Sequence, residues 1–392
     1  MPAGPKIRLA TFNVENLYSR PTFWDPQRLD DQRIGNVFFE DPTEAKVARR
    51  IFEATLSDEK CQLTALALMA ANADIVAIAE VDNLNALKMF RDQYLGRASG
   101  NALATLMKAF VHRTPRPSVQ ETIDYRSAEF ERIAYRHFAV LEGNDRRGID
   151  VGVLARPAWR AIKGHADASF ADLAVWPAGI ETYNDGDPKN PRPVMKTDRI
   201  FKRDCLEVEF EIGGAPLTVF ICHFKSMNGS RIGTRVMREA EMLAVRAIVT
   251  RRFGADTAKA NWAICGDFND YYEIDGDRDI RDLRTGEDSP SAIPVLLDGG
   301  FAVDIMQRRP PLDRWTTYHS ADDAYAQLDY ILLSPALAAA NPTVMPEVIR
   351  IGLPYRADRY SGKRLERIGW DRPKASDHCP VVVELTLPMR MT

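Results

Sequence analysis

Two short segments of the chain place acidic, amide and imidazole side chains where an apolar run meets a loop. Gly-Asp-Phe-Asn at 266–269 follows the apolar residues 262–265, and Ser-Asp-His at 376–378 comes shortly before the apolar residues 381–383. Placing polar groups at the end of a buried strand costs free energy unless they pair with one another, bind a metal or take part in catalysis. Two such segments in one chain indicate a metal-assisted active centre.

Other segments repeat this placement of a polar residue in or beside an apolar run. The residues concerned are Asn13, Glu80, His223 and Asp329. His223 and Lys225 are two positions apart, so their side chains point to the same side of an extended chain. A single polar residue at a strand end is more often structural than catalytic, but all these segments together favour one shared site.

In these motifs the chain resembles the endonuclease/exonuclease/phosphatase superfamily. The matching segments run in the family's order from Asn13 to His378, and Gly-Asp-Phe-Asn and Ser-Asp-His are the most specific of them. The resemblance therefore covers nearly the whole chain. It implies an α/β fold, a four-layer sandwich of two packed mixed β-sheets flanked by helices, with a metal site at one edge.

The resemblance also implies a metal site. Glu80 is similar to the family's main metal ligand, with Asn13 beside it in the metal site, and Asp377 is similar to the acidic residue that completes or supports the site. A hard, oxygen-rich and mostly hydrated site suits Mg²⁺ or Mn²⁺ rather than zinc. We expect one of these two ions as the cofactor.

The remaining motif residues resemble the catalytic groups of the family. Asp267 and Asn269 resemble the pair that orients the attacking water and the phosphate. His378 resembles the residue that contacts the scissile phosphate, with Asp329 fixing its tautomer. His223 is similar to a second histidine that serves the leaving oxygen, although the sequence shows no certain partner for it.

Two basic residues are candidates for substrate binding. Arg147 lies in an Arg-Gly-Ile-Asp segment at 147–150, and similar segments occur in bacterial nuclease-like members. Lys225 shares the side of His223 on an extended chain. Each of the two residues could contact a phosphate of the substrate. For Arg147, the alternative is that it is a surface arginine without a role in binding.

The elements that must position these residues follow from the hydrophobic pattern. Short apolar runs bounded by turn formers predict strands that are covered on both faces. They occupy 7–12, 75–79, 151–155, 206–212, 217–222, 262–265, 328–333 and 381–387. Helical patterns occupy 44–71, predicted as two pieces, 235–252, and more weakly 83–94.

Strands and helices alternate without a linker, so we expect one domain spanning 5–390. Less regular stretches predict surface insertions near 23–42, 165–199, 271–291 and 339–374. The part of the last insertion from 355 to 374 interleaves lysines and arginines with aromatic residues, which suits phosphate contact and base stacking, although a solvated loop is the plainer interpretation.

Composition sets further bounds. A formal net charge of -3 excludes a generally basic coat, but a local basic cleft is still compatible with it. The five cysteines are scattered without a metal-binding pattern, so we expect reduced thiols.

No apolar run is long enough to span a membrane, and the start lacks the apolar core of a signal peptide, which predicts a cytoplasmic protein. Secretion stays open if a leader was removed.

The predicted function is divalent-metal-dependent phosphodiester hydrolysis, with nucleic acid, DNA or RNA, as the first candidate substrate. The alternative is a phosphatase or phosphodiesterase for a lipid headgroup or a small phosphoester, because the superfamily keeps its core residues and varies its loops. A metal-free binding protein on the same fold is the third hypothesis. The complete set of motif residues argues against it.

Overall fold

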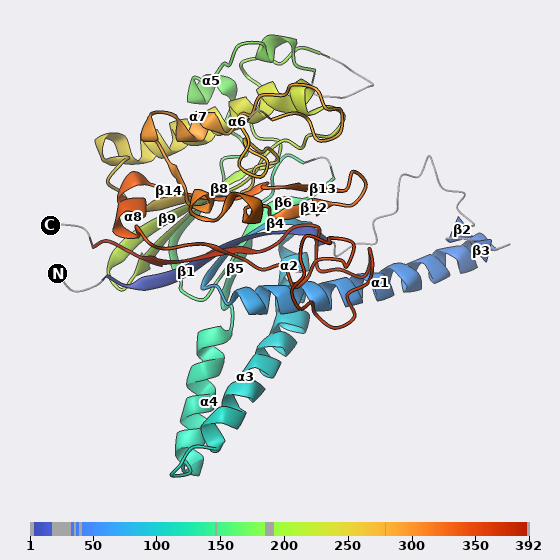
Figure 1. Ribbon diagram of the computed structural model, residues 1–392, viewed down its shortest axis with the longest axis vertical. Helices are drawn as coiled ribbons and strands as arrows, with labels where there is room; N and C mark the ends of the chain where they lie inside the picture. Colours follow the sequence, from blue (N-terminus) through green and yellow to red (C-terminus); the bar gives the residue numbers. More distant parts are fainter. Residues whose placement is uncertain are drawn as a thin grey trace.

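The computed structural model describes residues 4–17, 33–34, 37–38, 41–145, 147–184, 192–278 and 280–389. Its centre consists of two packed six-stranded sheets with helices on the outside (Figure 1). The first sheet has the order β15 (Glu347–Val348), β16 (Val381–Thr386), β1 (Lys6–Leu17), β4 (Ile75–Val81), β6 (Asp150–Ala155) and β5 (His137–Val140). The second has the order β11 (Val303–Asp304), β14 (Asp329–Leu333), β10 (Trp262–Asp267), β9 (Ala215–His223), β8 (Cys205–Ile212) and β7 (Trp159–Lys163).

Each sheet has one parallel pair at its centre, and its other neighbours are antiparallel. The parallel pairs are β1 with β4 and β9 with β10. Parallel neighbours need a long crossover connection, usually a helix. Helix α1 (Pro42–Ala71) follows β1, and helix α6 (Arg231–Phe253) connects β9 to β10. The two crossovers therefore place one long helix on the outer face of each sheet.

The strands are apolar on both faces because both faces are covered. In β10, Ala263 and Cys265 belong to the core between the two sheets, whereas Trp262 and Ile264 pack in the core that contains α6. A third core forms between the first sheet and α1. The result is four layers, helix, sheet, sheet and helix, so the predicted fold class is confirmed.

Every apolar run predicted as a strand is one, namely β1, β4, β6, β8, β9, β10, β14 and β16. The helical pattern at 44–71 forms one continuous helix instead of two pieces, because no Gly or Pro interrupts its hydrogen bonds after Pro42. The weak pattern at 83–94 becomes α2 (Leu84–Phe90) and a π-helical turn (Arg91–Leu95). The sequence analysis missed α3 (Gly96–Val111) and α4 (Val119–Ile133), a hairpin that projects from the sandwich (Figure 1).

The segments expected as insertions lie around the sandwich. In 165–199, α5 (Phe170–Leu173) packs with Ile180 and Val194 in the core that contains α6. In 339–374, Leu365 and Ile368 pack on the α1 side. Most of 23–42 lies outside the described residues, apart from a small pair of strands, β2 (Arg33–Ile34) and β3 (Val37–Phe38), and the start of α1.

The remaining short elements connect the layers. They are β12 (Thr317–His319), β13 (Ala324–Ala326), α7 (Pro294–Leu297), α8 (Pro335–Ala340) and 3-10 turns at Ile180–Thr182, Gly254–Asp256, Asp298–Gly300, Ile305–Arg308 and Pro311–Asp313. All five cysteines are free. Within the described part of the chain, no helix has the length and apolar character needed to cross a membrane.

Candidate active site

The strand register of the second sheet puts three of the predicted residues in one row. Asp267 at the end of β10 is paired with His223 on β9 and with Asp329 on β14. The preceding Gly266 has φ 146°, and a Cβ there would lie 1.8 Å from the carbonyl oxygen of Cys222. The motif therefore requires glycine at 266 because β9 and β10 approach too closely for a side chain at this point.

The first sheet contributes residues to the same place. Asn13 on β1 donates from Nδ2 to Oδ2 of Asp267 at 2.9 Å, which joins the two sheets directly. On the neighbouring β4, Oε1 of Glu80 lies 3.9 Å from Nε2 of His223, and that nitrogen is 3.6 Å from Oδ2 of Asp267. His223 therefore has two carboxylate neighbours that the sequence could not identify.

His378 completes the cluster from the loop before β16. Its Nδ1 lies 2.8 Å from Oδ2 of Asp329, and its Nε2 lies 3.8 Å from Oδ2 of Asp267. The loop is held to the first sheet by Ser376, whose hydroxyl donates to the carbonyl of Asn13 at 2.8 Å. Residues that lie far apart in the sequence thus meet at one end of both sheets.

Thr316 is a member of this cluster that the sequence analysis missed. Its buried hydroxyl donates to Oδ2 of Asp329 at 2.7 Å and accepts from the backbone N–H groups of Leu328 and Asp329. The Thr316 hydroxyl therefore fixes the position of the Asp329 carboxylate, which also contacts His378. A threonine inside an ordinary polar stretch carries no sequence signal for such a role.

Asn269 is held by the two loops that follow β9 and β10. Its backbone N–H donates to Oδ1 of Asp267 at 2.8 Å, and its Nδ2 donates to the carbonyl of Phe224 at 3.1 Å. Asn269 has φ 49° and Glu80 has φ 66°, both in the left-handed region that residues other than glycine rarely adopt. Such conformations cost free energy and concentrate at functional sites, where the surrounding structure holds them.

Burial and neighbouring charges shift the ionisation of the cluster. Burial opposes the charged form of His378, but Asp329 and Asp267 outweigh it and raise the pKa of His378 well above its ordinary value. Burial raises the pKa of Asp267 to about 7, although the charge of His378 lowers it. His378 is therefore an imidazolium at neutral pH, and Asp267 can exchange a proton near neutrality.

The pKa of His223 is shifted in the opposite direction from that of His378. Burial, followed by the charges of Arg203, Arg147 and His378, holds the pKa of His223 well below its ordinary value. Its Nδ1 is buried and has no hydrogen-bond partner among the described residues. His223 is thus a neutral imidazole, one ring nitrogen of which lies between Glu80 and Asp267.

Asp377 lies on a side of the cluster that carries two lysines. Burial disfavours its charged form, but Lys374, His378 and Lys60 lower the pKa of Asp377 below its usual value. Lys374 is also 3.1 Å from Oε1 of Glu15. Asp377 is therefore an anion at neutral pH, among basic side chains.

Arg147 and Lys225 lie on the His223 side. Arg147 forms a two-point ion pair with Asp145, and the buried Arg203 pairs with the same carboxylate at 2.7 Å. Arg203 also donates to the carbonyl of Phe224 at 2.9 Å, the acceptor that Asn269 uses. The N–H of Lys225 donates to Glu241 at 2.6 Å. Arg203 was not among the predicted site residues, since a basic residue in an irregular segment gives no specific signal.

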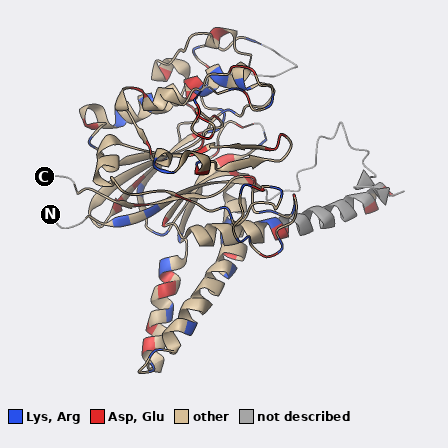
Figure 2. Cartoon of the chain, in the orientation of Figure 1, with Lys and Arg blue, Asp and Glu red and all other residues tan. Residues whose placement is uncertain are grey.

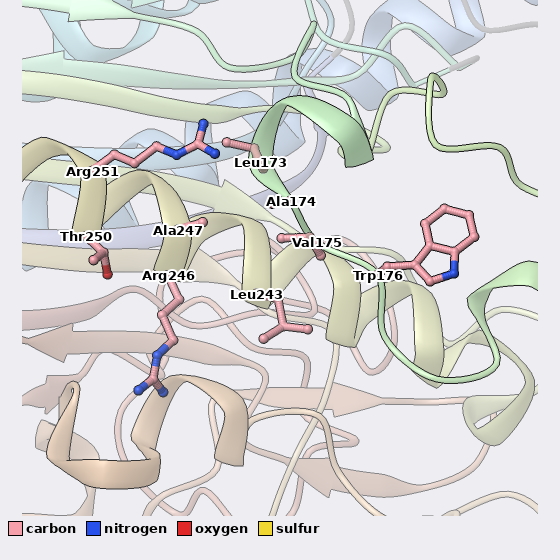
Figure 3. Close-up of a pocket in the computed structure, with 9 residues that line it drawn as sticks. All are labelled: Leu173, Ala174, Val175, Trp176, Leu243, Arg246, Ala247, Thr250 and Arg251. Atoms are coloured by element: carbon pink, nitrogen blue, oxygen red, sulfur yellow. The ribbon is translucent and has the colours of Figure 1, made fainter.

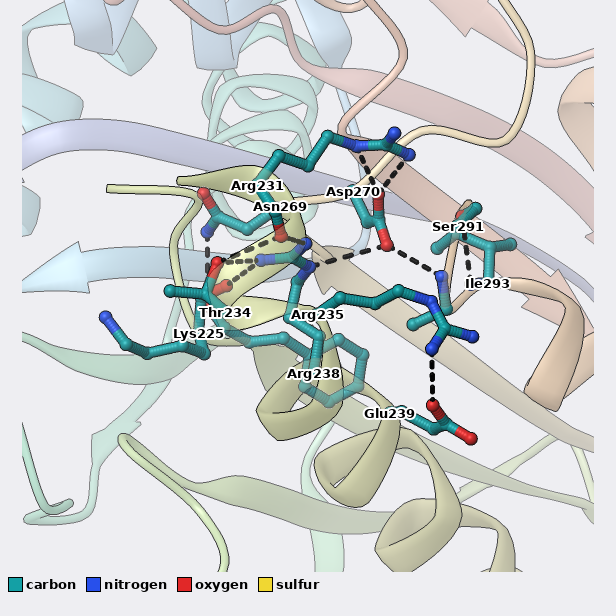
Figure 4. Close-up of polar contacts among 12 residues, drawn as sticks. Lys225, Arg231, Thr234, Arg235, Arg238, Glu239, Asn269, Asp270, Ser291 and Ile293 are labelled. Carbon is teal, nitrogen blue, oxygen red and sulfur yellow. Dashed lines mark hydrogen bonds and ion pairs between the residues drawn. The ribbon is translucent and has the colours of Figure 1, made fainter. Parts of the chain in front are cut away.

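Two buried arginines of α6 fix the loop after β10 (Figure 4). Arg231 donates from Nε and Nη2 to Oδ1 of Asp270 at 3.0 and 2.7 Å, and Nε of Arg238 is 3.4 Å from Oδ2 of the same carboxylate. All three side chains are fully buried. Because Asp270 follows Asn269 directly, these ion pairs determine where Asn269 lies.

The residues present fit a hydrated divalent cation. The carboxylate of Glu80 is 14% exposed. Among the described residues, the only side chain with a basic nitrogen within 4 Å of it is His223, and that ring is uncharged. No group of three His, Cys, Asp or Glu in the described part of the chain could enclose an ion. Mg²⁺ commonly takes only one or two carboxylates and keeps several waters, so one anionic ligand beside the Asn13 amide suits it.

The basic segment at 355–374 is tied into the protein. Arg364 stacks on Tyr355 and Tyr360 and donates to the carbonyls of Leu353 and Ala357. Arg359 pairs with Asp275 at 2.9 Å. Figure 2 shows basic and acidic residues intermixed over the molecule. Arg364 and Arg359 thus act within the fold, whereas Lys374 reaches the cluster and Arg372 contacts the same carboxylate of Glu15.

A hollow of about 410 Å³ between α5 and the second half of α6 is separate from this cluster (Figure 3). It is lined by Trp176, Leu243 and Arg251, among others, and contains none of the predicted site residues. Arg246, on its edge, donates to the carbonyls of Val295 and Asp298 and so holds α7 against α6. We assign this hollow no part in the chemistry.

Two packed mixed sheets that bring carboxylates, amides and two histidines together at their strand ends define a four-layer α/β sandwich with a polar cluster at one edge. A model of the Endonuclease/Exonuclease/phosphatase family matches residues 10–378. The chain belongs to this family, whose members act on phosphoesters and generally use divalent metals. The resemblance seen in the sequence motifs is thereby confirmed.

Solved structures of the same family are similar to this chain. One, from Leptotrichia buccalis, has 14% identity over 97% of this chain and 99% of that chain, with a TM-score of 0.45. Another, from Beutenbergia cavernae, has 15% identity over 98% of this chain and 72% of that chain, with a TM-score of 0.47. A humanized D. rerio TDP2 has 14% identity, 97% and 99% coverage, and a TM-score of 0.44. A search of the curated proteins gave no match.

Proposed function

We propose that this protein is a divalent-metal-dependent phosphodiester hydrolase and that its substrate is a nucleic acid. The observation that carries the proposal is the cluster of Asn13, Glu80, His223, Asp267 and His378, linked by contacts of 2.9 to 3.9 Å across the two sheets. It supplies an anionic metal ligand, a carboxylate that can accept a proton, an imidazolium and a neutral imidazole. Each of these groups can contribute to phosphodiester hydrolysis, by holding a cation, by accepting a proton from water or by stabilising charge on the phosphoryl and leaving oxygens.

Each residue has a distinct role in this proposal. Glu80 and Asn13 hold the cation, with Asp377 in support, and a bound Mg²⁺ or Mn²⁺ would stabilise negative charge on the phosphoryl oxygens. Asp267 accepts a proton from the attacking water, which Asn269 helps to orient. The imidazolium of His378, held by Asp329, donates to a phosphoryl oxygen. The neutral ring of His223 gives a hydrogen bond to the leaving oxygen, which takes its proton from water.

Basic groups on two sides of the cluster favour a polymeric substrate. Lys374 and Lys60 lie near Asp377, and Arg147, whose side chain is half exposed, lies near His223, whereas the neighbouring Arg203 is buried against Asp145. A nucleic acid has phosphates on both sides of the bond that is cut, so cations on both sides can neutralise them. A small phosphoester has no second phosphate, so the basic groups on one side of the cluster would have no phosphate to contact.

The test is a substrate screen with the purified protein. Plasmid, single-stranded DNA, RNA, sphingomyelin and bis(p-nitrophenyl) phosphate would each be incubated with Mg²⁺ or Mn²⁺ and with a chelator. We expect cleavage of a polynucleotide that the chelator abolishes. The His378→Ala variant, purified in the same way, controls for a contaminating nuclease.

Other outcomes of the screen would contradict the proposal in different ways. Hydrolysis of sphingomyelin or the small ester with intact polynucleotides would favour the alternative, a lipid or small-phosphoester hydrolase. Cleavage that persists in the chelator would contradict the metal requirement. We also propose that residues 5–390 act as one domain, since the cluster draws on strands from both ends of the chain.

A further inference from the structure

An exposed turn at 369–373 presents a tryptophan and an arginine beside the cluster. Trp370 is 66% exposed, and the side chain of Arg372 is 76% exposed. This part of the chain lies next to α1 (Figure 1), where Arg367 is 3.6 Å from Glu59. A large ring that is exposed to this extent has most of its surface free for a partner, and it combines a flat apolar face with a neighbouring positive charge.

The backbone of this turn is fixed by hydrogen bonds. The N–H of Gly369 donates to the carbonyl of Pro373 at 2.9 Å, and a Cβ at 369 would lie 1.9 Å from the carbonyl oxygen of Arg372. The carbonyls of Gly369 and Trp370 accept from the N–H groups of residues 355–356 at 3.0 and 2.9 Å. The turn therefore holds the exposed ring in place, so less conformational entropy is lost when the ring binds a partner.

Arg372 extends from the turn to the strand that carries Asn13. Its Nη2 lies 3.6 Å from Oε1 of Glu15, and the N–H of Glu15 donates to Oδ1 of Asn13 at 2.9 Å. The same oxygen of Glu15 is 3.1 Å from Nζ of Lys374, whose side chain is only 11% exposed. Glu15 therefore keeps a cation when Arg372 turns to another anion, and an exposed ion pair of this kind costs at most about 1 kcal/mol to break.

We propose that Arg372 and Trp370 bind a single-stranded nucleic acid next to the cluster, an inference that rests on the proposed function. The guanidinium contacts the phosphate that neighbours the one being cut, and the indole stacks on an unpaired base beside it. In a duplex the bases stack on one another inside the helix, so they offer Trp370 no free face. The intervening Asp371 is 3.4 Å from Arg356, which reduces its repulsion of the phosphate.

The first test is a binding measurement that needs no turnover. Fluorescence anisotropy would follow a short labelled single strand, and a duplex of the same sequence, with the wild-type protein in a chelator. We expect the single strand to bind about tenfold more tightly than the duplex. Trp370→Ala should weaken binding of the single strand about tenfold and of the duplex less than about twofold.

Trp176→Ala is the matched control for this measurement. Trp176 is 36% exposed and lines the hollow beside α6, away from the cluster, so its replacement should change neither affinity. Equal binding of the two nucleic acids by the wild type, or an unchanged single-strand affinity in Trp370→Ala, would overturn the proposal.

The second test distinguishes stacking from a structural role of Trp370. A base that stacks on an indole quenches its emission, so oligothymidylate should lower the intrinsic fluorescence of the wild-type protein. Trp370→Phe keeps an aromatic ring and should retain the affinity within about threefold while it loses most of the quenching. Full quenching in Trp370→Phe would place the bases on another tryptophan and refute the stacking contact.

The third test removes the charge of one phosphate from the substrate. In an oligonucleotide that is cut at one linkage, a neutral methylphosphonate would replace the linkage on each side of the cut in turn. On one side only, this replacement should lower kcat/KM of the wild type about tenfold, and Arg372→Ala should have a similar effect on the unmodified substrate. Combined, the two changes should cost less than about twofold more than either alone, because they remove the same contact.

Arg160→Ala is the matched control for Arg372→Ala, because Arg160 on β7 is also an exposed arginine paired with a carboxylate, that of Glu211. It should leave kcat/KM unchanged on both substrates. Fully additive losses for Arg372→Ala and the methylphosphonate would exclude a contact between Arg372 and this phosphate.

The outcomes separate this proposal from the proposed function. Chelator-sensitive cleavage of a polynucleotide, with wild-type binding and kinetics in Trp370→Ala and Arg372→Ala, would support the proposed function and overturn this binding surface. A protein that neither binds nor cuts any polynucleotide would contradict both.

Discussion

At the scale of single residues, the charge on His378 depends on its contacts with two carboxylates. Asp329 holds Nδ1 at 2.8 Å and is itself oriented by the Thr316 hydroxyl, while Asp267 lies 3.8 Å from Nε2. These contacts keep the ring protonated although it is buried. The second histidine, His223, is neutral in the same cluster because burial, and after it the charges of nearby cations, lower its pKa. Two histidines in one cluster therefore have different charges.

We expect His378→Ala to lower kcat by at least about a hundredfold, because an imidazolium that stabilises transition-state charge is lost. Asp329→Asn and Thr316→Val should lower kcat in the same direction by smaller factors, since both act through the orientation of the ring. Steady-state kinetics on the best substrate of the screen would measure these effects. Near wild-type turnover in all three variants would exclude this role for His378.

Glu80→Gln should raise the metal concentration needed for half-maximal activity while leaving the fold intact, because one anionic ligand is lost from a site with few protein ligands. Isothermal titration with Mn²⁺ would measure the affinity directly. Glu129→Gln, on the projecting α4, is the matched control. An unchanged Mn²⁺ affinity in Glu80→Gln would place the metal elsewhere in the molecule.

At the scale of elements, α6 covers the second sheet and also anchors the loops of the cluster. Its Arg231 and Arg238 hold Asp270 in the loop after β10 (Figure 4). Its Glu241 accepts from the backbone N–H of Lys225 in the loop after β9. The helix thus connects packing in the core with the position of Asn269. Its two buried guanidinium groups share the carboxylate of Asp270, which offsets part of the cost of placing their charges in the interior.

We expect Asp270→Asn to lower the free energy of unfolding by about 3–5 kcal/mol, because two buried guanidinium groups lose their shared carboxylate. Chemical denaturation would measure this loss. The activity of the folded fraction should also fall through kcat more than through KM, since Asn269 is displaced while the basic groups that bind phosphate are untouched. Asp256→Asn, on an exposed turn, should change neither quantity. An unchanged kcat in folded Asp270→Asn would limit the network to a structural role.

At the scale of the whole molecule, stability should depend on a buried carboxyl at the start of β8. Burial raises the pKa of Asp204 to about 6, although its hydrogen bonds from the backbone lower it. A carboxyl with a raised pKa in the folded state favours folding when it is protonated. Its contribution is therefore fully present below the usual aspartate pKa and is lost as the pH rises through about 6.

Asp204→Asn should accordingly stabilise the protein at pH 8 by about 1–3 kcal/mol, because the amide keeps an oxygen for the N–H of His165 and carries no charge. The gain should shrink as the pH falls through 6 and vanish near pH 4. Denaturation curves of both proteins across this range would measure it. A difference that is independent of pH would show that ionisation of Asp204 is not its cause.

The strands and the family of this protein could be predicted from the sequence, because both depend on local pattern. A strand covered on both faces is a continuous apolar run, and a polar residue at its end, such as Glu80 or Asp267, stands out against that run. The α3–α4 hairpin was missed although both of its helices are amphipathic; Gly96 and Gly100 weaken the helical signal at the start of α3.

The partners of the site residues follow only from the folded chain. Glu80 and His223 lie on different sheets, and only the packing of β4 beside β9 brings them within 3.9 Å. Thr316, Arg203 and the arginines of α6 act through contacts with distant backbone and carboxylate groups, and nothing in their own sequence neighbourhoods marks those contacts. Local sequence sets which residues are buried or polar at a strand end, whereas contacts between distant residues depend on how sheets and helices pack, which is a property of the whole chain.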